Sequence, residues 1–356
     1  MKSTSLISAA SLSNVIKQDV GESETRRKAL FYCTLLALQY GLQPILAKHF
    51  SSPNASKNSI VIATELVKIG ITASSMLQET SDFRRNLWSS WSFHDYLKIA
   101  AVPAALYAIQ NLMMQYSYIL LDSMTVNLLN QTKTLSAALF LYLILGNKQS
   151  STQIFALLLL LIAALTLTNG MMMYENLIQG KMLSAAETGK EHDGMYYLGT
   201  SLVLGASAIS GLSTALTQKA LKSGRHALMF SAELAVFGIV VLVVTDWFQK
   251  RQLFQEGGPF RGWTLMTLVP VATNAMGGII VGLVTKYAGG VTKGFALIAG
   301  ILVTALSEYF VYGSRLGPEH LIATVLVSIS IYLHSNFKYK EGSDGNTKSV
   351  KKSKVE

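Results

Sequence analysis

The chain carries little charge and almost no cysteine. Only 14% of its 356 residues are charged, against roughly a quarter in a soluble globular protein, and half are hydrophobic. The single cysteine, Cys33, lies inside the first apolar run, which excludes a disulfide framework and a cysteine-based metal site. These shortages favour a multi-pass membrane protein over a soluble enzyme.

Motifs of several other protein classes are also missing. There is no Walker A sequence, so an ATP-driven pump is not indicated, and the six histidines have no metal-ligand spacing. The net charge of +10 comes from basic residues in short segments between apolar runs, without the interleaved aromatics of an RNA-binding patch. We therefore expect no nucleic-acid partner, no metal, no cofactor and no enzymatic activity. A membrane-embedded sugar transferase is the enzyme alternative, with Asp122 as its one nearby carboxylate.

Ten apolar runs are each long enough to cross a bilayer, which takes about 20 mostly apolar residues. Because backbone polar groups in lipid must be paired internally, these runs predict helices. The expected fold is therefore all-α, a polytopic membrane protein with ten transmembrane helices. The runs lie at 29–47, 59–77, 97–116, 124–146, 152–170, 196–217, 227–246, 263–285, 292–313 and 319–335.

The loop charges predict the orientation. Lys and Arg outside the runs gather in the two tails and in alternate loops, and cytosolic segments of membrane proteins carry this excess. Residues 1–27 and the basic tail 337–356 are therefore expected in the cytosol, with a sequon at Asn54 in the first lumenal loop. The first 27 residues are too polar for a signal peptide.

The last residues of the chain contain two lysines with the spacing of a targeting signal. Lys352 and Lys354 stand fifth and third from the end, which resembles a cytosolic retrieval signal of the endoplasmic reticulum. We expect residence in the endoplasmic-reticulum membrane, with cycling through the Golgi, and coat proteins that read these lysines as partners. A plain basic tail is the alternative.

The two halves of the chain contain similar sequence segments in the same order. Ala63-Thr-Glu65-Leu66 parallels Ser231-Ala-Glu233-Leu234, and Pro103 parallels Pro270 at nearly the same offset. Chance similarity between apolar segments is the alternative. With five spans in each half, the second repeat (195–336) is inverted relative to the first (28–170) within one domain, 28–336. Inverted repeats are typical of alternating-access transporters, whose substrate site lies at the repeat interface.

Several charges fall inside the runs, where each costs at least about 2.5–3.5 kcal/mol, so they are candidates for function. Glu65 and Lys68 are three residues apart on one helix face and predict a structural charge pair. Glu233 is the repeat counterpart of Glu65 but has no such lysine, so it needs another partner or a proton. Glu308 is a further charge of this kind.

Three more lysines predict an anion site. Lys133 ends a polar stripe in the fourth run, which must face a cavity or another helix. Lys286 and Lys293 flank a glycine-containing junction, and Lys293 opens a helix, where free N–H groups and a cation favour an anion. Lys286 alternatively extends to the membrane interface. Lys133 and Lys293, from opposite halves, would suit a diphosphate as point charges.

Four stretches carry a resemblance to a known family. They are Leu106-Tyr-Ala-Ile-Gln110-Asn111, Leu121-Asp122-Ser, Asn130-Gln-Thr-Lys133 and Lys286-Tyr-Ala-Gly-Gly-Val-Thr-Lys293-Gly294-Phe295. Over about 29–335 the chain resembles the nucleotide-sugar transporters of the drug/metabolite transporter superfamily. The resemblance implies ten helices and exchange of a nucleotide-sugar for the nucleoside monophosphate. It also implies that Lys133 and Lys293 contact the phosphates, with Tyr107 and Asn111 at the nucleotide or sugar end.

Departures from the family pattern narrow the subgroup. Many members have paired asparagines where this chain has Asn111-Leu112, and Asp-Asn where it has Gly289-Gly290. The plant endoplasmic-reticulum transporters of UDP-N-acetylglucosamine and UDP-N-acetylgalactosamine are similar to this chain at these positions. They are also similar over 38–44, 123–133, 262–270 and 274–285.

We therefore expect an antiporter that carries UDP-N-acetylglucosamine or UDP-N-acetylgalactosamine into the lumen in exchange for UMP. Its partners are these nucleotides and the lipid bilayer, and a homodimer is left open. The alternatives are a UDP-galactose or CMP-sialic acid carrier, a phosphorylated-metabolite transporter, and a non-transporting receptor in which the lysines are dispensable. The residues expected to bind substrate are Lys133, Lys293, Tyr107, Asn111, Asn127, Asn130, Gln131, Ser210, Asn274 and Lys286.

Overall fold

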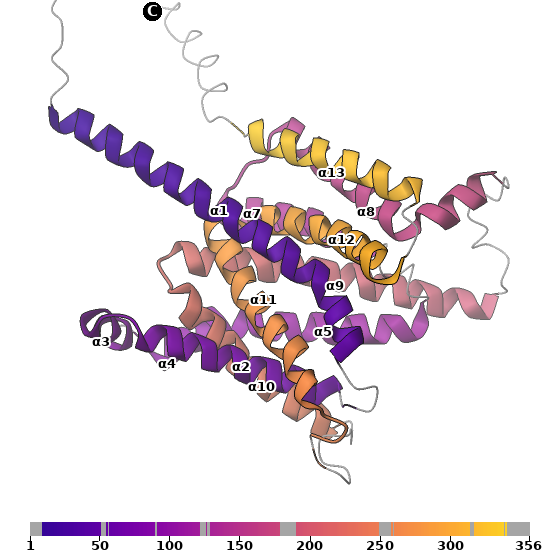
Figure 1. Ribbon diagram of the computed structural model, residues 1–356, viewed down its shortest axis with the longest axis horizontal. Coiled ribbons are helices and arrows are strands. Elements are labelled where there is room, and N and C mark those ends of the chain that lie inside the picture. Colours follow the sequence, from indigo (N-terminus) through magenta and orange to yellow (C-terminus); the bar gives the residue numbers. More distant parts are fainter. Residues whose placement is uncertain are drawn as a thin grey trace, which may run out of the picture.

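The computed structural model of the chain is a helical bundle (Figure 1). It describes residues 9–50, 57–89, 91–121, 129–178, 190–248, 260–313 and 317–337, with the single residues 55, 126, 258 and 339. No strand occurs in these residues, so the all-α prediction is confirmed for them. The helices are α1 (Ala9–Phe50), α2 (Lys57–Leu77), α3 (Ser81–Ser89), α4 (Phe93–Tyr96), a π-helix (Leu97–Ala101), α5 (Val102–Leu120), α7 (Lys133–Leu145), α8 (Ser151–Ile178), α9 (Lys190–Lys222), α10 (Ala227–Phe248), a 3₁₀ turn (Leu265–Thr267), α11 (Leu268–Tyr287), α12 (Gly290–Tyr312) and α13 (Pro318–Asn336).

Seven helical segments in the described residues are long and apolar enough to cross a membrane. These segments lie in α1, α2, α9, α10, α11 and α12 and in the stretch from α4 into α5. Two shorter apolar helical segments are Lys133–Leu145 of α7 and Ser151–Thr166 of α8. The protein is therefore a multi-pass membrane protein. Each of the ten expected ranges overlaps a helix, and the number of crossings stays a prediction.

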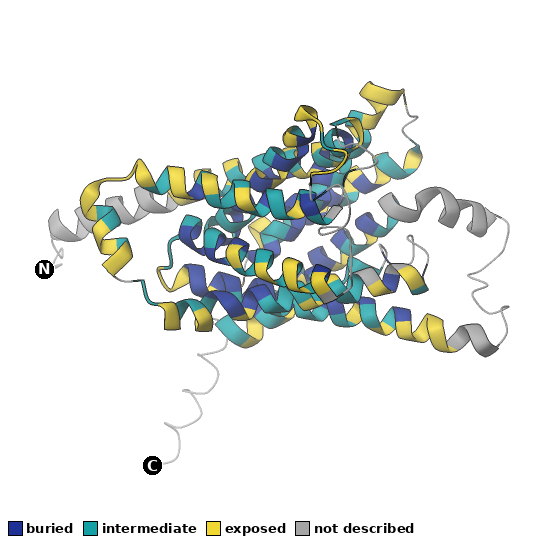
Figure 2. Ribbon diagram, turned by 90° about the horizontal axis from the view of Figure 1, so that it is seen from below, coloured by how far each residue is buried: buried dark blue, intermediate teal, exposed yellow. Residues whose placement is uncertain are grey.

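Many large apolar side chains are exposed on the outside of the bundle. Figure 2 shows that exposed positions recur along its helices. Ile119, Phe310 and Leu321 are 76%, 79% and 71% exposed. The buried core is made mostly of alanine, valine and leucine. This distribution suits a bilayer, because helices in lipid associate by close packing of small residues and leave their large apolar side chains to the acyl chains.

Six main helix–helix pairings build the bundle. α1 packs on α11 and α12, while α9 packs on α5 and α7. α2 packs along α10, and α8 packs along α13. Figure 1 shows α1 crossing α11 and α12. Polar contacts fix two of the pairings, since Ser213 of α9 donates to the Pro103 carbonyl of α5 at 2.9 Å, and Gln153 of α8 donates to the His334 carbonyl of α13 at 3.2 Å.

Two helices differ from the ranges expected. α1 begins at Ala9 and so runs through most of the segment expected as a polar tail. The fourth run is interrupted by a turn at Gln131 and Thr132, so that α7 begins at Lys133. The Thr132 hydroxyl donates to the Leu129 carbonyl at 2.7 Å, and such a local bond competes with the helical ladder. Lys133 therefore stands in the first turn of a helix, not in the middle of one.

Gly211 lets α9 approach α7 closely. A Cβ atom at this position would lie 2.5 Å from the Ser136 carbonyl carbon and 2.7 Å from the Ala137 nitrogen. These are backbone atoms, so the clash is relieved only by moving the helices apart.

We expect Gly211→Ala to destabilise the protein by about 1–3 kcal/mol, as overpacking does. The measurement is the thermal unfolding temperature in detergent, which we expect to be lower for Gly211→Ala than for the unmodified protein. Gly70→Ala in α2 is the matched control, because a Cβ there meets nothing within 4 Å. An unchanged melting temperature for Gly211→Ala would contradict the close approach.

Candidate functional site

Lys133 and Lys293 come together at the starts of two helices. Lys133 is the first residue of α7, and Lys293 lies in the first turn of α12. The two positive charges are close enough to repel each other. The Lys293 Nζ atom donates to Thr214 Oγ1 of α9 at 3.0 Å. The site therefore combines two lysines with the first turns of two helices, and the positive end of a helix dipole favours an anion.

The turn from α11 into α12 depends on its glycines. Gly289 has a φ of +89°, a conformation that residues with a Cβ rarely adopt, and it caps α12. A Cβ on Gly290 would collide with the Thr214 methyl group. Gly294 packs against Thr134 of α7, where a Cβ would lie 2.7 Å from the threonine Cγ2. These contacts bring the start of α12 onto α9 and α7.

A buried residue of α9 also holds the α12 start. Gln218 is only 4% exposed, and its Oε1 atom accepts from the Gly290 backbone N–H at 2.6 Å. Thr214 is 3% exposed and lies four residues earlier on the same face of α9. Sequence reasoning did not single out Gln218. The signal that could have found it was the i, i+4 spacing of Thr214 and Gln218, which places two polar residues on one face at the end of a predicted span.

A cavity of about 790 Å³ lies between α1, α2, α11 and α12. This volume is within the usual range for small-molecule sites. Its polar lining includes Glu65 and Lys68 of α2, Asn274 of α11 and Glu308 of α12. The other polar residues that line it are Gln39, Tyr40, Gln43, Thr64, Thr304 and His320.

A second cavity of about 370 Å³ lies between α2, α5, α10 and α11. Tyr107 and Asn111 line it from α5. Glu65 and Lys68 also line it, so this pair stands between the two cavities.

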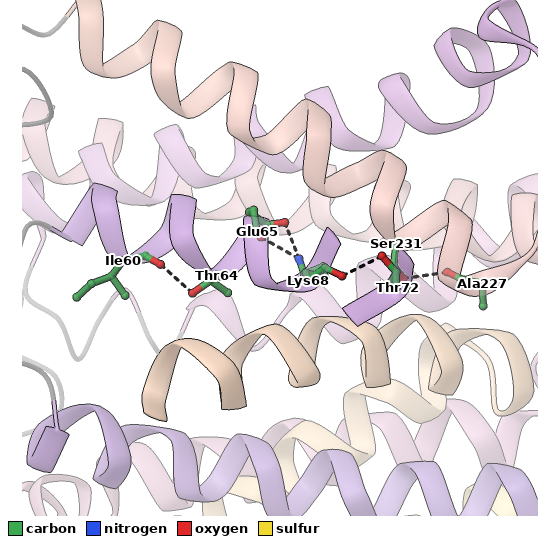
Figure 3. Close-up of polar contacts among 7 residues, drawn as sticks. All are labelled: Ile60, Thr64, Glu65, Lys68, Thr72, Ala227 and Ser231. Carbon is green, nitrogen blue, oxygen red and sulfur yellow. Dashed lines mark hydrogen bonds and ion pairs between the residues drawn. The ribbon is translucent and has the colours of Figure 1, made fainter. Parts of the chain in front are cut away.

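The Glu65–Lys68 pair is formed within α2 (Figure 3). The Lys68 Nζ atom donates to both carboxylate oxygens of Glu65, at 2.8 and 2.7 Å. Gly278 of α11 makes room for this lysine, because a Cβ there would lie 2.6 Å from the Lys68 Cε. The nearby hydroxyls of Thr64 and Thr72 bond to carbonyls of their own helix, which satisfies them in an apolar setting.

The remaining expected substrate residues are distributed around these features. Asn130 and Gln131 precede Lys133 and are half-buried. Ser210 lies one turn before Thr214 on α9. Lys286 lies 5.5 Å from the ring centre of Tyr287. Asn127, Lys352 and Lys354 lie outside the described residues. Within the described lining, neither cavity includes Lys133 or Lys293, so the expected set falls into a lysine cluster and two cavities.

Glu233 has the partner that the sequence left open. Arg225, in the turn before α10, forms an ion pair with its carboxylate through Nη2 and adds a second bond through Nε at 3.3 Å. The Trp91 indole donates to the same carboxylate at 2.8 Å. Glu233 is only 7% exposed, so its charge is fully paired in a buried place.

Comparisons with known proteins show the family of the chain. The nucleotide-sugar transporter family matches residues 29–335. The UDP-N-acetylglucosamine transporter ROCK1 of Arabidopsis thaliana is 38% identical over 88% of this chain and 93% of its own length. The UDP-N-acetylglucosamine/UDP-N-acetylgalactosamine transporter nstp-4 of Caenorhabditis elegans is 27% identical over 81% and 84%. A solved crystal structure superposes with a TM-score of 0.60 at 11% identity, covering 86% of this chain and 95% of that one, which is a likeness of fold. The chain therefore belongs to the nucleotide-sugar transporter family.

Proposed function

We propose that this protein exchanges cytosolic UDP-N-acetylglucosamine or UDP-N-acetylgalactosamine for lumenal UMP across the endoplasmic-reticulum or Golgi membrane. The names of its relatives support the sugar and the base. The observation that carries the proposal is the lysine cluster, in which Lys133 and Lys293 stand at two helix starts from opposite halves of the chain. Such a cluster is suited to the diphosphate that all UDP-sugars share.

The charge of the cluster gives a reason for exchange. A site with two half-buried cations that repel each other is costly to leave empty, and a phosphate-bearing ligand neutralises both charges. Return of the empty carrier is therefore unfavourable, while return with UMP keeps the phosphate site filled. Tyr107 and Asn111 in the smaller cavity and Asn274 in the larger one would contact the uracil or the sugar.

The helix pairings support inverted repeats and alternating access. If α1, α2, α5, α7 and α8 are matched in order to α9, α10, α11, α12 and α13, the main pairings map onto themselves. The contacts of α1 with α11 and α12 correspond to those of α9 with α5 and α7, while α2–α10 and α8–α13 are pairs of counterparts. The close approach of Gly41 to Gly300 corresponds to that of Gly211 to Ser136. The lysine cluster and the cavities would then lie between the repeats, where such carriers bind substrate.

Uptake into liposomes tests the function. Purified protein would be reconstituted with and without internal UMP and offered radiolabelled UDP-N-acetylglucosamine, UDP-N-acetylgalactosamine, UDP-galactose and CMP-sialic acid. Uptake of the N-acetylhexosamine nucleotides that requires internal UMP is the expected result. Uptake of another nucleotide-sugar would transfer the proposal to that substrate. Failure of every nucleotide-sugar with folded protein would contradict it.

Thr214→Val should impair substrate binding without unfolding the protein. The variant keeps the side-chain volume but removes the hydroxyl that accepts from Lys293 at 3.0 Å. The loss of one charge-assisted hydrogen bond costs about 1.5–3 kcal/mol, so we expect roughly a ten- to hundredfold fall in uptake kcat/KM, mostly through KM.

Thr214→Ser is the matched control, because serine keeps the hydroxyl and should retain most of the uptake. Equal losses in both variants would mean that the methyl packing on Gly290, not the bond to Lys293, matters at this position.

A further inference from the structure

The connection between α2 and α5 presents a row of large apolar side chains to its surroundings. Trp88 of α3 is 63% exposed and Phe93 of α4 is 61% exposed. Leu97, at the start of the π-helix, is also exposed. In water such a row would be unfavourable, and tryptophan is enriched where a protein meets the headgroup region of a bilayer.

This connection is held firmly against the bundle from its other side. The Phe83 ring packs edge-on against His226, with ring centres 5.4 Å apart. Burial and the nearby Lys286 charge lower the pKa of His226, so this ring is neutral at pH 7 and packs as an apolar partner. The Arg84 side chain donates to the last carbonyl of α2, at Leu77, at 3.1 Å. The Trp91 indole and the Tyr96 hydroxyl both donate to Glu233, to its side chain and its backbone carbonyl.

The exposed rings are thus supported by rings that are fixed. Trp88 contacts Trp91 with ring centres 6.4 Å apart, and Phe93 contacts Tyr96 at 5.9 Å. The outward direction of Trp88 and Phe93 is therefore imposed by the fold and is not a consequence of a loose loop.

The row also continues a lipid-facing surface. Val102, Ile109 and Tyr116 of α5 are all exposed and recur every seven residues, which places them on one face of the helix. This stripe runs from the transmembrane part of α5 toward Leu97. In Figure 1, α3 is seen nearly end-on at one end of the molecule, whereas the long helices run across the view. α3 therefore lies across the direction of the spans, as a helix in the plane of the membrane surface does.

We propose that α3 and the first residues of the spanning stretch that begins at Phe93, together residues 81–97, form an interfacial arm. In this arm Trp88, Phe93 and Leu97 insert into the headgroup–acyl boundary of the adjacent leaflet. The occupant of this surface is phospholipid. The arm carries two basic and two acidic residues, so it has no net charge and suits zwitterionic lipid. The exposed Arg85 of α3 and the exposed Lys98, which directly follows the arm, can contact lipid phosphates. Because Trp91 and Tyr96 bind Glu233, the arm also links this leaflet to the start of α10.

Spin labels at single cysteines test the arm in phosphatidylcholine nanodiscs. In the Cys33→Ser protein, labels would be placed by Trp88→Cys or Phe93→Cys, and by Asn86→Cys on the opposite face of α3, which is exposed. Collisions with oxygen, which partitions into lipid, and with a water-soluble nickel chelate would be measured for each label. We expect the oxygen-to-nickel ratio at 88 and 93 to exceed that at 86 several-fold.

Two results would overturn the proposal. Equal ratios at all three positions would place the arm in water, and low accessibility to both probes at 88 and 93 would mean that protein covers it. A second measurement uses a variant in which only Trp88 of the arm is changed, to phenylalanine. Brominated phosphatidylcholine should quench the tryptophan fluorescence of the unmodified protein more than that of Trp88→Phe, and equal quenching would also count against insertion.

Discussion

Lys293→Ala is expected to reduce nucleotide-sugar uptake on the order of a hundredfold or more. The ammonium group stands at the start of α12, held by Thr214 and opposite Lys133, where the diphosphate would be bound. Removing one partner of a buried charge pair costs about 2–5 kcal/mol, and 1.4 kcal/mol corresponds to a factor of ten. The measurement is initial uptake by UMP-loaded liposomes, together with binding of UMP to the detergent-solubilised protein.

Lys222→Ala is the matched control for this prediction. Lys222 is an exposed residue at the end of α9, and we expect its loss to leave uptake nearly unchanged. Lys293→Arg tests the geometry, because a planar guanidinium does not replace a compact ammonium beside Thr214. Normal uptake by both Lys293→Ala and Lys222→Ala would mean that Lys293 does not bind the phosphates and that the lysine cluster is not the phosphate site.

Arg225→Ala is expected to lower the stability of the protein by about 3–5 kcal/mol, because it leaves the buried Glu233 carboxylate without its cation. The Trp91 indole remains as a donor but carries no charge. The effect would be measured as a large fall in the thermal unfolding temperature in detergent.

A double variant separates the ion pair from simple loss of packing. In Arg225→Ala/Glu233→Gln the charge that lost its partner is also removed, so we expect part of the stability to return. Lys219→Ala, which removes an exposed lysine of α9, should have little effect. A double variant that is no more stable than Arg225→Ala would show that Arg225 acts through its contacts and not through the charge of Glu233.

The positions of the helices could be predicted because the sequence signal for a membrane-spanning helix is local. A run of apolar residues long enough to span lipid must form a helix, whatever surrounds it. Each expected range therefore overlaps an observed helix. The same reasoning does not locate a break such as that at Gln131 and Thr132, because polar residues are compatible with both a turn and a helix.

Ion-pair partners could be predicted only for charged residues that lie close together in the sequence. The three-residue spacing of Glu65 and Lys68 pointed to their contact, and the structure has this ion pair within one helix. The partner of Glu233 comes from the preceding turn and from Trp91, which is 142 residues away in the sequence. No periodicity encodes such a contact.

The sequence by itself determined that this chain is a helical membrane protein of the nucleotide-sugar transporter family, and it marked the lysines that fall within its apolar runs. Those features follow from composition, apolar run length and motif, each of which is read locally. Only the tertiary structure decided that Gln218 and Thr214 hold the start of α12, that Glu65 and Lys68 separate two cavities, and that the arm before α5 turns its aromatic rings outward. These contacts and cavities depend on which helices pack against each other at their small residues. That choice is made by packing between segments far apart in the chain, which no local pattern encodes.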